Sequence, residues 1–190
     1  MINTKEIILK TSQNLFARFG LKKTTVDEIA KLAHIGKGTI YHYFKTKEQI
    51  FAEIIDKESR YLRQKIREAV QQARTPQEKV HAFVLTRLRT IKALTNYYSA
   101  MTDDYLQHYS FIEKARKDSF EEELNLVKSI LEEGTASKVF TVEDTGLTAF
   151  AIVTALKGFE YPWTVETSLA DIEQNVNVLI SVLFKGIETR

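Results

Sequence analysis

A short run of cationic, hydroxyl-bearing and aromatic side chains follows closely spaced glycines in residues 34–51, HIGKGTIYHYFKTKEQIF. Ammonium groups and hydroxyls can bond phosphate oxygens, and such groups and flat rings can also meet base edges in a DNA groove. The side chains concerned are those of Lys37, Thr39, Tyr41, His42 and Tyr43. Their types and spacing indicate recognition of duplex DNA.

Helical spacing divides this run into two faces. Ile40 and Phe44 are four residues apart and share one face, which we expect to pack against the preceding helix. The opposite face would present the polar set to solvent. Tyr41 and Tyr43 could instead cover the edge of a small core, but the lysines on either side favour phosphate contact. His42 could equally be a passive surface histidine.

The residues before this run supply the elements that would position it. The capping pattern TVDE, from Thr25 to Glu28, predicts a helix over residues 26–33. The turn HIGKG and a short helix over 37–43 would complete a helix-turn-helix unit. We expect Gly36 to relax the turn and Gly38 to allow close approach to another surface.

Two further residues could hold the DNA backbone. Thr25, at the start of the helix over 26–33, could combine capping with a phosphate contact. Lys47 lies in the first turn of the following helix, beside free backbone N–H groups, and this arrangement favours phosphate binding.

Helical periodicity continues along most of the chain and predicts an all-α fold of about nine helices. A helix over 3–19 is expected to end at Gly20, because glycine is common just beyond a helix. Capping patterns and breaks predict the later helices at 47–73, 76–95, 97–107, 110–133, 142–160 and 169–187. We expect Pro162 to end the helix over 142–160, since a residue before proline disfavours helical geometry.

Residues 24–51, TTVDEIAKLAHIGKGTIYHYFKTKEQIF, resemble the tetracycline-repressor (TetR) family of bacterial regulators. The resemblance implies a helix-turn-helix DNA-binding domain in residues 1–46 and an effector-binding and dimerisation domain in residues 47–190. It also implies a homodimer that binds a roughly palindromic operator and usually represses transcription. The DNA-binding residues implied by position are Thr25, Lys37, Gly38, Thr39, Tyr41, His42, Tyr43 and Lys47.

The charge distribution agrees with a polyanion as partner. Residues 1–50 contain nine lysines and arginines but only four acidic residues. The remainder contains 18 lysines and arginines and 21 acidic residues. A basic head on an acidic body favours contact with DNA, although chance unevenness could produce the same split. The chain has no cysteine, and its apolar runs at 149–153 and 178–184 are too short to cross a bilayer. We therefore expect a cytoplasmic protein without a membrane partner.

The sequence offers little for catalysis. The four histidines, His34, His42, His81 and His108, are scattered, so neither a metal site nor a cofactor is expected. The segment GKGT lacks the glycine spacing and leading strand of a phosphate-binding loop. No nucleophile–base set can be assembled, so we predict that the protein is not an enzyme. The alternative to a ligand-responsive repressor is an architectural or interaction protein that uses the same fold without an effector.

Aromatic residues in the body could line an effector pocket. Each could belong to the core, but together they supply apolar surface with a few hydroxyls, which suits a small hydrophobic or aromatic effector. A fatty acyl chain is conceivable. The residues are Tyr97, Tyr98, Met101, Tyr105, Phe120, Phe159 and Trp163. Arg87, Arg89 or His108 could meet an anionic end, although a surface position is the simpler expectation for each.

The last two predicted helices could form a dimer interface. Two helices from each protomer would make a self-complementary four-helix contact. Alternatively, packing within the protomer could bury part of the apolar surface of these two helices. The penultimate helix contributes Leu147, Phe150, Ala151, Thr154, Ala155 and Gly158, and the last helix contributes Ile172, Val176, Leu179, Ile180, Leu183 and Ile187.

Overall fold

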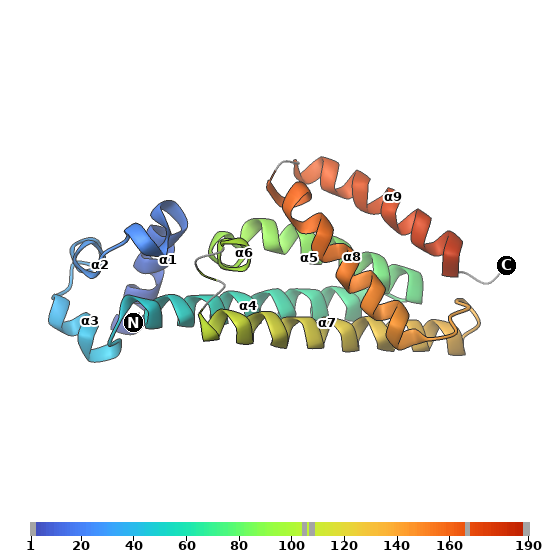
Figure 1. Ribbon diagram of the computed structural model, residues 1–190, viewed down its shortest axis with the longest axis horizontal. Helices are drawn as coiled ribbons and strands as arrows, with labels where there is room; N and C mark the ends of the chain where they lie inside the picture. Colours follow the sequence, from blue (N-terminus) through green and yellow to red (C-terminus); the bar gives the residue numbers. More distant parts are fainter. Residues whose placement is uncertain (1–2, 104–105, 107–108, 166–167, 188–190) are drawn as a thin grey trace. The chain divides into compact units, whose positions relative to one another are not determined.

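The computed structural model describes residues 3–103, 106, 109–165 and 168–187, without the side chains of residues 98, 101, 102, 160–165 and 169. The described residues form nine α-helices, which confirms the predicted all-α fold (Figure 1). The helices are α1 Thr4–Lys23, α2 Val26–Ala33, α3 Lys37–Tyr43, α4 Lys47–Gln72, α5 Pro76–Ala93, α6 Thr95–Thr102, α7 Ser110–Ala136, α8 Thr145–Val165 and α9 Leu169–Ile187. Among them, no helix combines the length and apolar character needed to cross a bilayer.

The chain divides into two compact units. The head unit comprises Met1–Arg60 and Leu94–Ala115, and the body unit comprises Tyr61–Ala93 and Arg116–Arg190. The head unit therefore includes the first part of α4 and all of α6, and it is larger than the predicted domain of residues 1–46. The division within α4 falls inside a continuous helix rather than in a loop.

The core of the head unit explains how its three N-terminal helices are held. α1 contacts α2, and α2 contacts α3. The ring of Phe16 on α1 meets that of Phe51 on α4 edge to face, with 5.2 Å between centroids. Burial of such rings is among the larger stabilising contributions in a small core. The fully buried aliphatic residues around them include Ile8, Ile29, Ile40 and Ile50.

Gly20 interrupts α1 near its end. Its φ of 76° and ψ of 163° are not helical, although a further helical turn follows it. The prediction that regular helix stops before Gly20 is therefore confirmed, but the short turn at residues 21–23 was not predicted. The positive φ explains the glycine, because side chains rarely adopt this conformation.

A buried carboxylate connects three helices of the head unit. Glu58 on α4 is 4% exposed and accepts hydrogen bonds from Gln13 Nε2 on α1 at 2.7 Å and from Asn96 Nδ2 at 3.0 Å. It also accepts a 2.7 Å bond from the backbone N–H of Tyr97 in the first turn of α6. The residue before α6 provides no side-chain cap. Glu58 therefore takes the place of a local cap and satisfies one N–H at the start of that helix.

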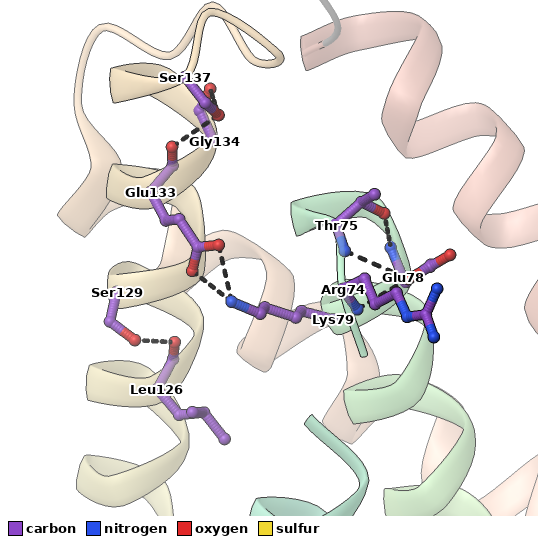
Figure 2. Close-up of polar contacts among 9 residues, drawn as sticks. All are labelled: Arg74, Thr75, Glu78, Lys79, Leu126, Ser129, Glu133, Gly134 and Ser137. Atoms are coloured by element: carbon purple, nitrogen blue, oxygen red, sulfur yellow. Dashed lines mark hydrogen bonds and ion pairs between the residues drawn. The ribbon is translucent and has the colours of Figure 1, made fainter. Parts of the chain in front are cut away.

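In the body unit, α5 contacts both α8 and α9. The predicted start of α5 is confirmed: Thr75 Oγ1 accepts the Glu78 N–H at 3.2 Å, and Glu78 accepts the Thr75 N–H at 3.1 Å (Figure 2). Lys79 Nζ then bonds both carboxylate oxygens of Glu133 at 2.6 Å and joins α5 to α7. A capping box and an ion pair thus fix the first turn of α5.

Several predicted helix ends differ from the structure. α6 spans Thr95–Thr102 and ends at the extended residue Asp103, so the helix predicted over 97–107 is placed too late and is too long. α7 continues past Gly134 to Ala136, and a Cβ on Gly134 would lie 2.1 Å from the Phe140 ring, so this glycine serves packing. α8 begins after Asp144, whose carboxylate accepts the Leu147 N–H at 2.8 Å, rather than after Thr141. α8 also continues through Pro162 to Val165. The bias of a residue before proline is a tendency, and proline-containing helices are its exception.

Candidate nucleic-acid interface

The two faces of α3 lie as the sequence predicts. Ile40 and Phe44 are 1% and 4% exposed and belong to the core of the head unit. The opposite face is open to solvent, and its exposed members are Lys37, Gly38, Thr39, Tyr41, His42 and Tyr43. Tyr41 and Tyr43 are 47% and 39% exposed, so neither is sequestered in the core. The polar face is accessible to a partner, while its individual DNA contacts remain predictions.

The turn before α3 is formed differently from our expectation. His34, a non-glycine residue, adopts the left-handed conformation with φ 54° and ψ 41°. Its N–H donates to Lys31 O at 3.3 Å, and the Ile35 N–H donates to Ala30 O at 3.1 Å. These bonds close the end of α2 in a Schellman-type arrangement. Gly36 has an ordinary φ of −69°, so the expectation that it relaxes the turn is wrong.

Gly38 has open space around it. A Cβ at this position would meet no atom of the described structure within 4 Å. Packing within the head unit therefore does not explain this glycine. Its openness is compatible with the predicted approach of another surface to the start of α3.

Thr25 caps α2 as predicted. Its hydroxyl oxygen accepts the Glu28 N–H at 3.3 Å, while the hydroxyl donates to Glu28 Oε2 at 2.8 Å. Glu28 also accepts the Thr25 N–H at 2.8 Å, and the bonds from Thr25 lower the pKa of this carboxyl below its ordinary value. A phosphate contact from the Thr25 hydroxyl would replace its bond to Glu28.

Lys37 pairs with an acidic residue of α2. Its ammonium lies 2.9 Å from both carboxylate oxygens of Asp27. The hydrogen bond that Lys37 donates to Asp27 raises the pKa of Lys37 above its ordinary value. Because the two side chains are 48% and 71% exposed, water screens the pair and it adds little to stability. Asp27 and a DNA phosphate would therefore compete for the same ammonium.

Lys47 has a different environment from the one expected. Its ammonium donates to the carbonyl oxygens of Leu21 at 2.8 Å, Lys22 at 3.2 Å and Thr24 at 3.0 Å. An ammonium has three N–H donors, so these bonds can use all of them. A cation is also favourable where carbonyls end a helix. In this structure Lys47 ties α4 to the end of α1, and a phosphate contact would require it to give up one of these bonds.

The predicted effector residues do not all fall in one unit. Tyr97 belongs to the head unit, where it is 5% exposed, whereas Phe120 and Phe159 are half-buried in the body unit. The side chains of Tyr98, Met101 and Trp163, and the whole of Tyr105, lie outside the described residues. A single pocket formed by this set remains a prediction.

The two arginines for which a surface position was the simpler expectation differ in burial. Arg87 is 2% exposed, which contradicts the simpler expectation of a surface position. Its Nε lies 2.9 Å from Glu123 Oε2, and the Glu123 side chain is equally buried. Arg89 pairs with Glu173 nearer the surface. His108 lies outside the described residues.

The predicted dimer residues separate into two groups. The α8 residues Leu147, Phe150, Ala151, Thr154, Ala155 and Gly158 are all exposed. On α9, Ile172, Val176 and Ile180 are at most 5% exposed, and Leu179, Leu183 and Ile187 are half-buried. α9 contacts α5, so the three buried residues pack inside the protomer and do not offer a face to a partner. Among the described side chains of α9, the large apolar ones that are exposed are instead Val178 and Val182, at 61% and 65%.

A three-helix core that exposes one short polar helix defines the class of helix-turn-helix DNA-binding proteins. Within that class, residues 8–54 match the family model for bacterial regulatory proteins of the tetR family. The regulator YhgD of Bacillus subtilis is 30% identical over 190 residues, covering 98% of this chain and 97% of that protein. The chain belongs to the TetR family of transcriptional regulators, which bind operator DNA and are not enzymes.

Two further similarities extend over nearly the whole chain. The fatty acid metabolism regulator protein of Bacillus subtilis is 25% identical over 186 residues, covering 96% of this chain and 95% of that protein. The crystal structure of a transcriptional regulator from Cytophaga hutchinsonii superposes with a TM-score of 0.78 at 25% identity, covering 97% and 98% of the two chains. The similarity therefore includes the body unit as well as the head.

Proposed function

We propose that the protein acts as a homodimeric repressor on a roughly palindromic operator and that a small, largely apolar effector releases it. The observation that carries the DNA-binding part is the exposed polar face of α3 above a buried apolar face. Lys37 and Thr39 at the start of α3 would lie nearest the bases, and Tyr41 and Tyr43 would bond phosphates. His42 would reach either bases or backbone.

Operator binding can be tested by a mobility-shift assay on the DNA upstream of the protein's own gene. We expect a specific complex whose affinity falls steeply with salt, because lysine contacts release counterions from DNA. Failure to find specific, salt-sensitive binding there or elsewhere in the genome would refute the proposal. Many dispersed sites without a promoter response would favour the architectural alternative.

The dimer part of the proposal rests on the exposed surfaces of α8 and α9. Leu147 and Phe150 on α8 and Val178 and Val182 on α9 are large apolar side chains exposed by 49–66%. The exposed small residues that follow this pair on α8, Ala151, Thr154 and Ala155, and Gly158 with open space at its Cβ position, would let a second helix approach closely. A two-fold arrangement would bring the same surfaces together from both protomers. The dimer would then present two α3 helices to major grooves about 34–36 Å apart.

For the effector, we propose a molecule with a long apolar part that binds in the body unit. The similarity to a fatty acid metabolism regulator makes an acyl compound the first candidate. The Arg87–Glu123 pair supplies buried charge inside the body unit, and Arg87 could exchange Glu123 for an anionic ligand group. A ligand releases the repressor only if it binds the DNA-incompetent state more tightly.

A titration of the operator complex with acyl-coenzyme A thioesters of increasing chain length tests the effector. We expect release to become more effective as the chain lengthens, since each buried methylene contributes about 0.8 kcal/mol. An Arg87→Met variant that still folds should lose the preference for an anionic ligand group. If no acyl compound changes the affinity for the operator, this choice of effector is wrong, while the assignment as a DNA-binding regulator stands.

A further inference from the structure

An acidic residue of α2 lies beside the polar face of α3. The Asp27 side chain is 71% exposed, and both of its carboxylate oxygens lie 2.9 Å from Lys37 Nζ. Asp27 is one of only four acidic residues in residues 1–50, and unlike Glu28 it takes no part in the capping box of α2. A carboxylate repels the phosphates of DNA. Asp27 therefore opposes a phosphate contact at this point of the surface.

The two side chains retain hydrogen-bonding capacity when they are paired. An ammonium has three N–H donors, and a carboxylate has about four lone-pair sites. Two bonds between Lys37 and Asp27 leave a donor on the ammonium and acceptor sites on the carboxylate. Neither side chain has another partner in the part of the chain that the structure describes. The pair thus presents a donor and an acceptor side by side, 2.9 Å apart, to solvent.

The major-groove edge of a G·C base pair has the complementary arrangement. Guanine O6 is an acceptor, and cytosine N4 has a hydrogen available in the groove besides the one that pairs with O6. O6 and N4 are about 2.9 Å apart, because an N–H···O bond joins them. With Lys37 opposite O6 and Asp27 opposite N4, these four groups would close a ring of four hydrogen bonds.

The other base pairs match the two side chains less well. A reversed C·G pair would place the ammonium against the N4 donor and the carboxylate against the O6 acceptor, so both contacts would be repulsive. A T·A pair, with thymine opposite Lys37, keeps the order of acceptor and donor. Thymine, however, offers O4 beside a methyl group, whereas guanine offers two neighbouring acceptors, O6 and N7. The arrangement therefore favours guanine opposite Lys37 and cytosine opposite Asp27.

We propose that Asp27 is a specificity-determining residue, which reads one G·C pair in each half-site together with Lys37. Lys37 donates to guanine, and Asp27 accepts from cytosine N4. Gly38, the next residue of α3, adds no side chain beside the pair, and the space at its Cβ position is open. The inference rests on the proposed operator binding. It adds an acidic residue of α2 to a set of DNA contacts that the sequence placed on cations, hydroxyls and rings.

The base preference can be tested by selecting duplexes from a randomised pool with the full chain. We expect the wild type to enrich a G·C pair at one position of each half-site. Asp27→Ala should show a weaker preference at that position, because only Lys37 then distinguishes the pair, and unchanged preferences elsewhere. Glu6→Ala removes the same charge from an exposed site on α1 and should leave every preference unchanged. Both residues are exposed, so the fold should survive, and thermal unfolding checks this.

The contact to cytosine can be tested with one modified base. N4-methylcytosine still pairs with guanine, but a methyl group replaces the hydrogen that Asp27 would accept. In the selected duplex this base should weaken binding of the wild type and of Glu6→Ala about tenfold, which is typical for one lost base contact. Asp27→Ala should lose less than about twofold, since it makes no contact to this hydrogen. Fluorescence anisotropy with labelled duplexes measures these affinities.

The outcomes separate this inference from the function on which it rests. If Asp27→Ala has the same base preferences as the wild type, or only binds all duplexes more tightly, Asp27 does not read a base and the inference is wrong. Equal losses of the wild type and Asp27→Ala on N4-methylcytosine would also overturn it, although specific operator binding would stand. If no duplex is enriched at all, the proposed operator binding fails, and this inference fails with it.

Discussion

The surfaces of the head and body units that carry the proposed functions differ in chemistry. The head exposes a cationic and hydroxyl-bearing face on α3, and the buried carboxylate of Glu58 accepts bonds from neutral donors. The body exposes large apolar side chains on α8 and α9 and buries the ion pair of Arg87 and Glu123. A polar, hydrated face suits a polyanion, whereas exposed apolar helices suit another protein surface. Surface chemistry thus separates the proposed roles of the units more clearly than their shared helical structure does.

The largest effect should come from the interior of the body. Arg87→Leu leaves the Glu123 carboxylate buried without its cation, and we expect the free energy of unfolding to fall by about 3–5 kcal/mol. Urea denaturation followed by circular dichroism measures this loss. Arg89→Leu is the control, because the Arg89–Glu173 pair is nearly half exposed and should cost at most about 1 kcal/mol. If the free energy of unfolding fell equally in the two variants, burial would not determine how much each ion pair contributes to stability.

The exposed apolar face of the body should control assembly. Val182→Glu would place a charge in the proposed interface, and two-fold symmetry would place it there twice. We expect the dimer to weaken by about 2 kcal/mol or more, which corresponds to roughly thirtyfold in the dissociation constant. Analytical ultracentrifugation over a dilution series measures the change. Leu32→Glu places the same charge on an exposed apolar position of the head, and weakening of the dimer by both variants alike would contradict the proposed interface.

Variants of two lysines in the head unit should have separate effects, one on operator binding and the other on the stability of the fold. Lys37→Ala removes an accessible ammonium, and we expect about tenfold weaker operator binding with unchanged thermal stability. Lys47→Ala removes the donor for three carbonyls at the end of α1, and we expect about 1–2 kcal/mol lower stability. Fluorescence anisotropy with labelled operator and thermal unfolding measure the two quantities. If Lys47→Ala instead weakened DNA binding without loss of stability, Lys47 would contact phosphate as the sequence predicted.

Both units contain one described non-glycine residue with positive φ, His34 in the head and Lys138 in the body. His34→Gly and Lys138→Gly should each stabilise the protein by about 0.5–1 kcal/mol, because glycine adopts this conformation without steric cost. Denaturant unfolding of the two variants allows a direct comparison of the units. If His34→Gly alone lowered the free energy of unfolding, the imidazole of His34 would stabilise the fold by more than the positive φ of this residue destabilises it.

The smallest effect should be a pH dependence in the head. The bonds from Thr25 lower the pKa of Glu28 in the folded state below its ordinary value of 4.5. Its contribution to stability is therefore present above pH 4.5 and is lost as the pH falls through the folded-state pKa. Glu28→Gln should reduce the loss of stability between pH 5 and pH 3 in acid titrations of the unfolding midpoint. An unchanged profile would show that the capping carboxylate does not contribute measurably.

The sequence predicted features that depend on near neighbours in the chain. The two faces of α3 follow from the spacing of Ile40 and Phe44, and the start of α2 follows from Thr25 and Glu28. Patterns among neighbouring residues did not predict contacts between residues that are distant in the sequence. Lys47 bonds carbonyls 23–26 residues earlier, and no local pattern indicates this.

The C-terminal predictions were incomplete for the same physical reason. The apolar stripe on α9 indicates a buried face but not which helix packs against it. In the structure Ile172, Val176 and Ile180 are buried, and α9 contacts α5 of the same protomer. Arg87 is buried because Glu123, 36 residues later, compensates its charge. The glycine pattern also misled, since His34 rather than Gly36 makes the left-handed turn.

The continuity of α4 restricts which insertions and deletions the sequence can accept. This helix contributes Lys47–Arg60 to one unit and Tyr61–Gln72 to the other without an intervening loop. Each residue of an α-helix advances the chain by about 100° of rotation and about 1.5 Å of rise. A one-residue insertion or deletion near Tyr61 would thus rotate every later helical position out of register. A chimaera that joins this N-terminal part to the C-terminal part of another family member must therefore preserve the number of residues across this helix.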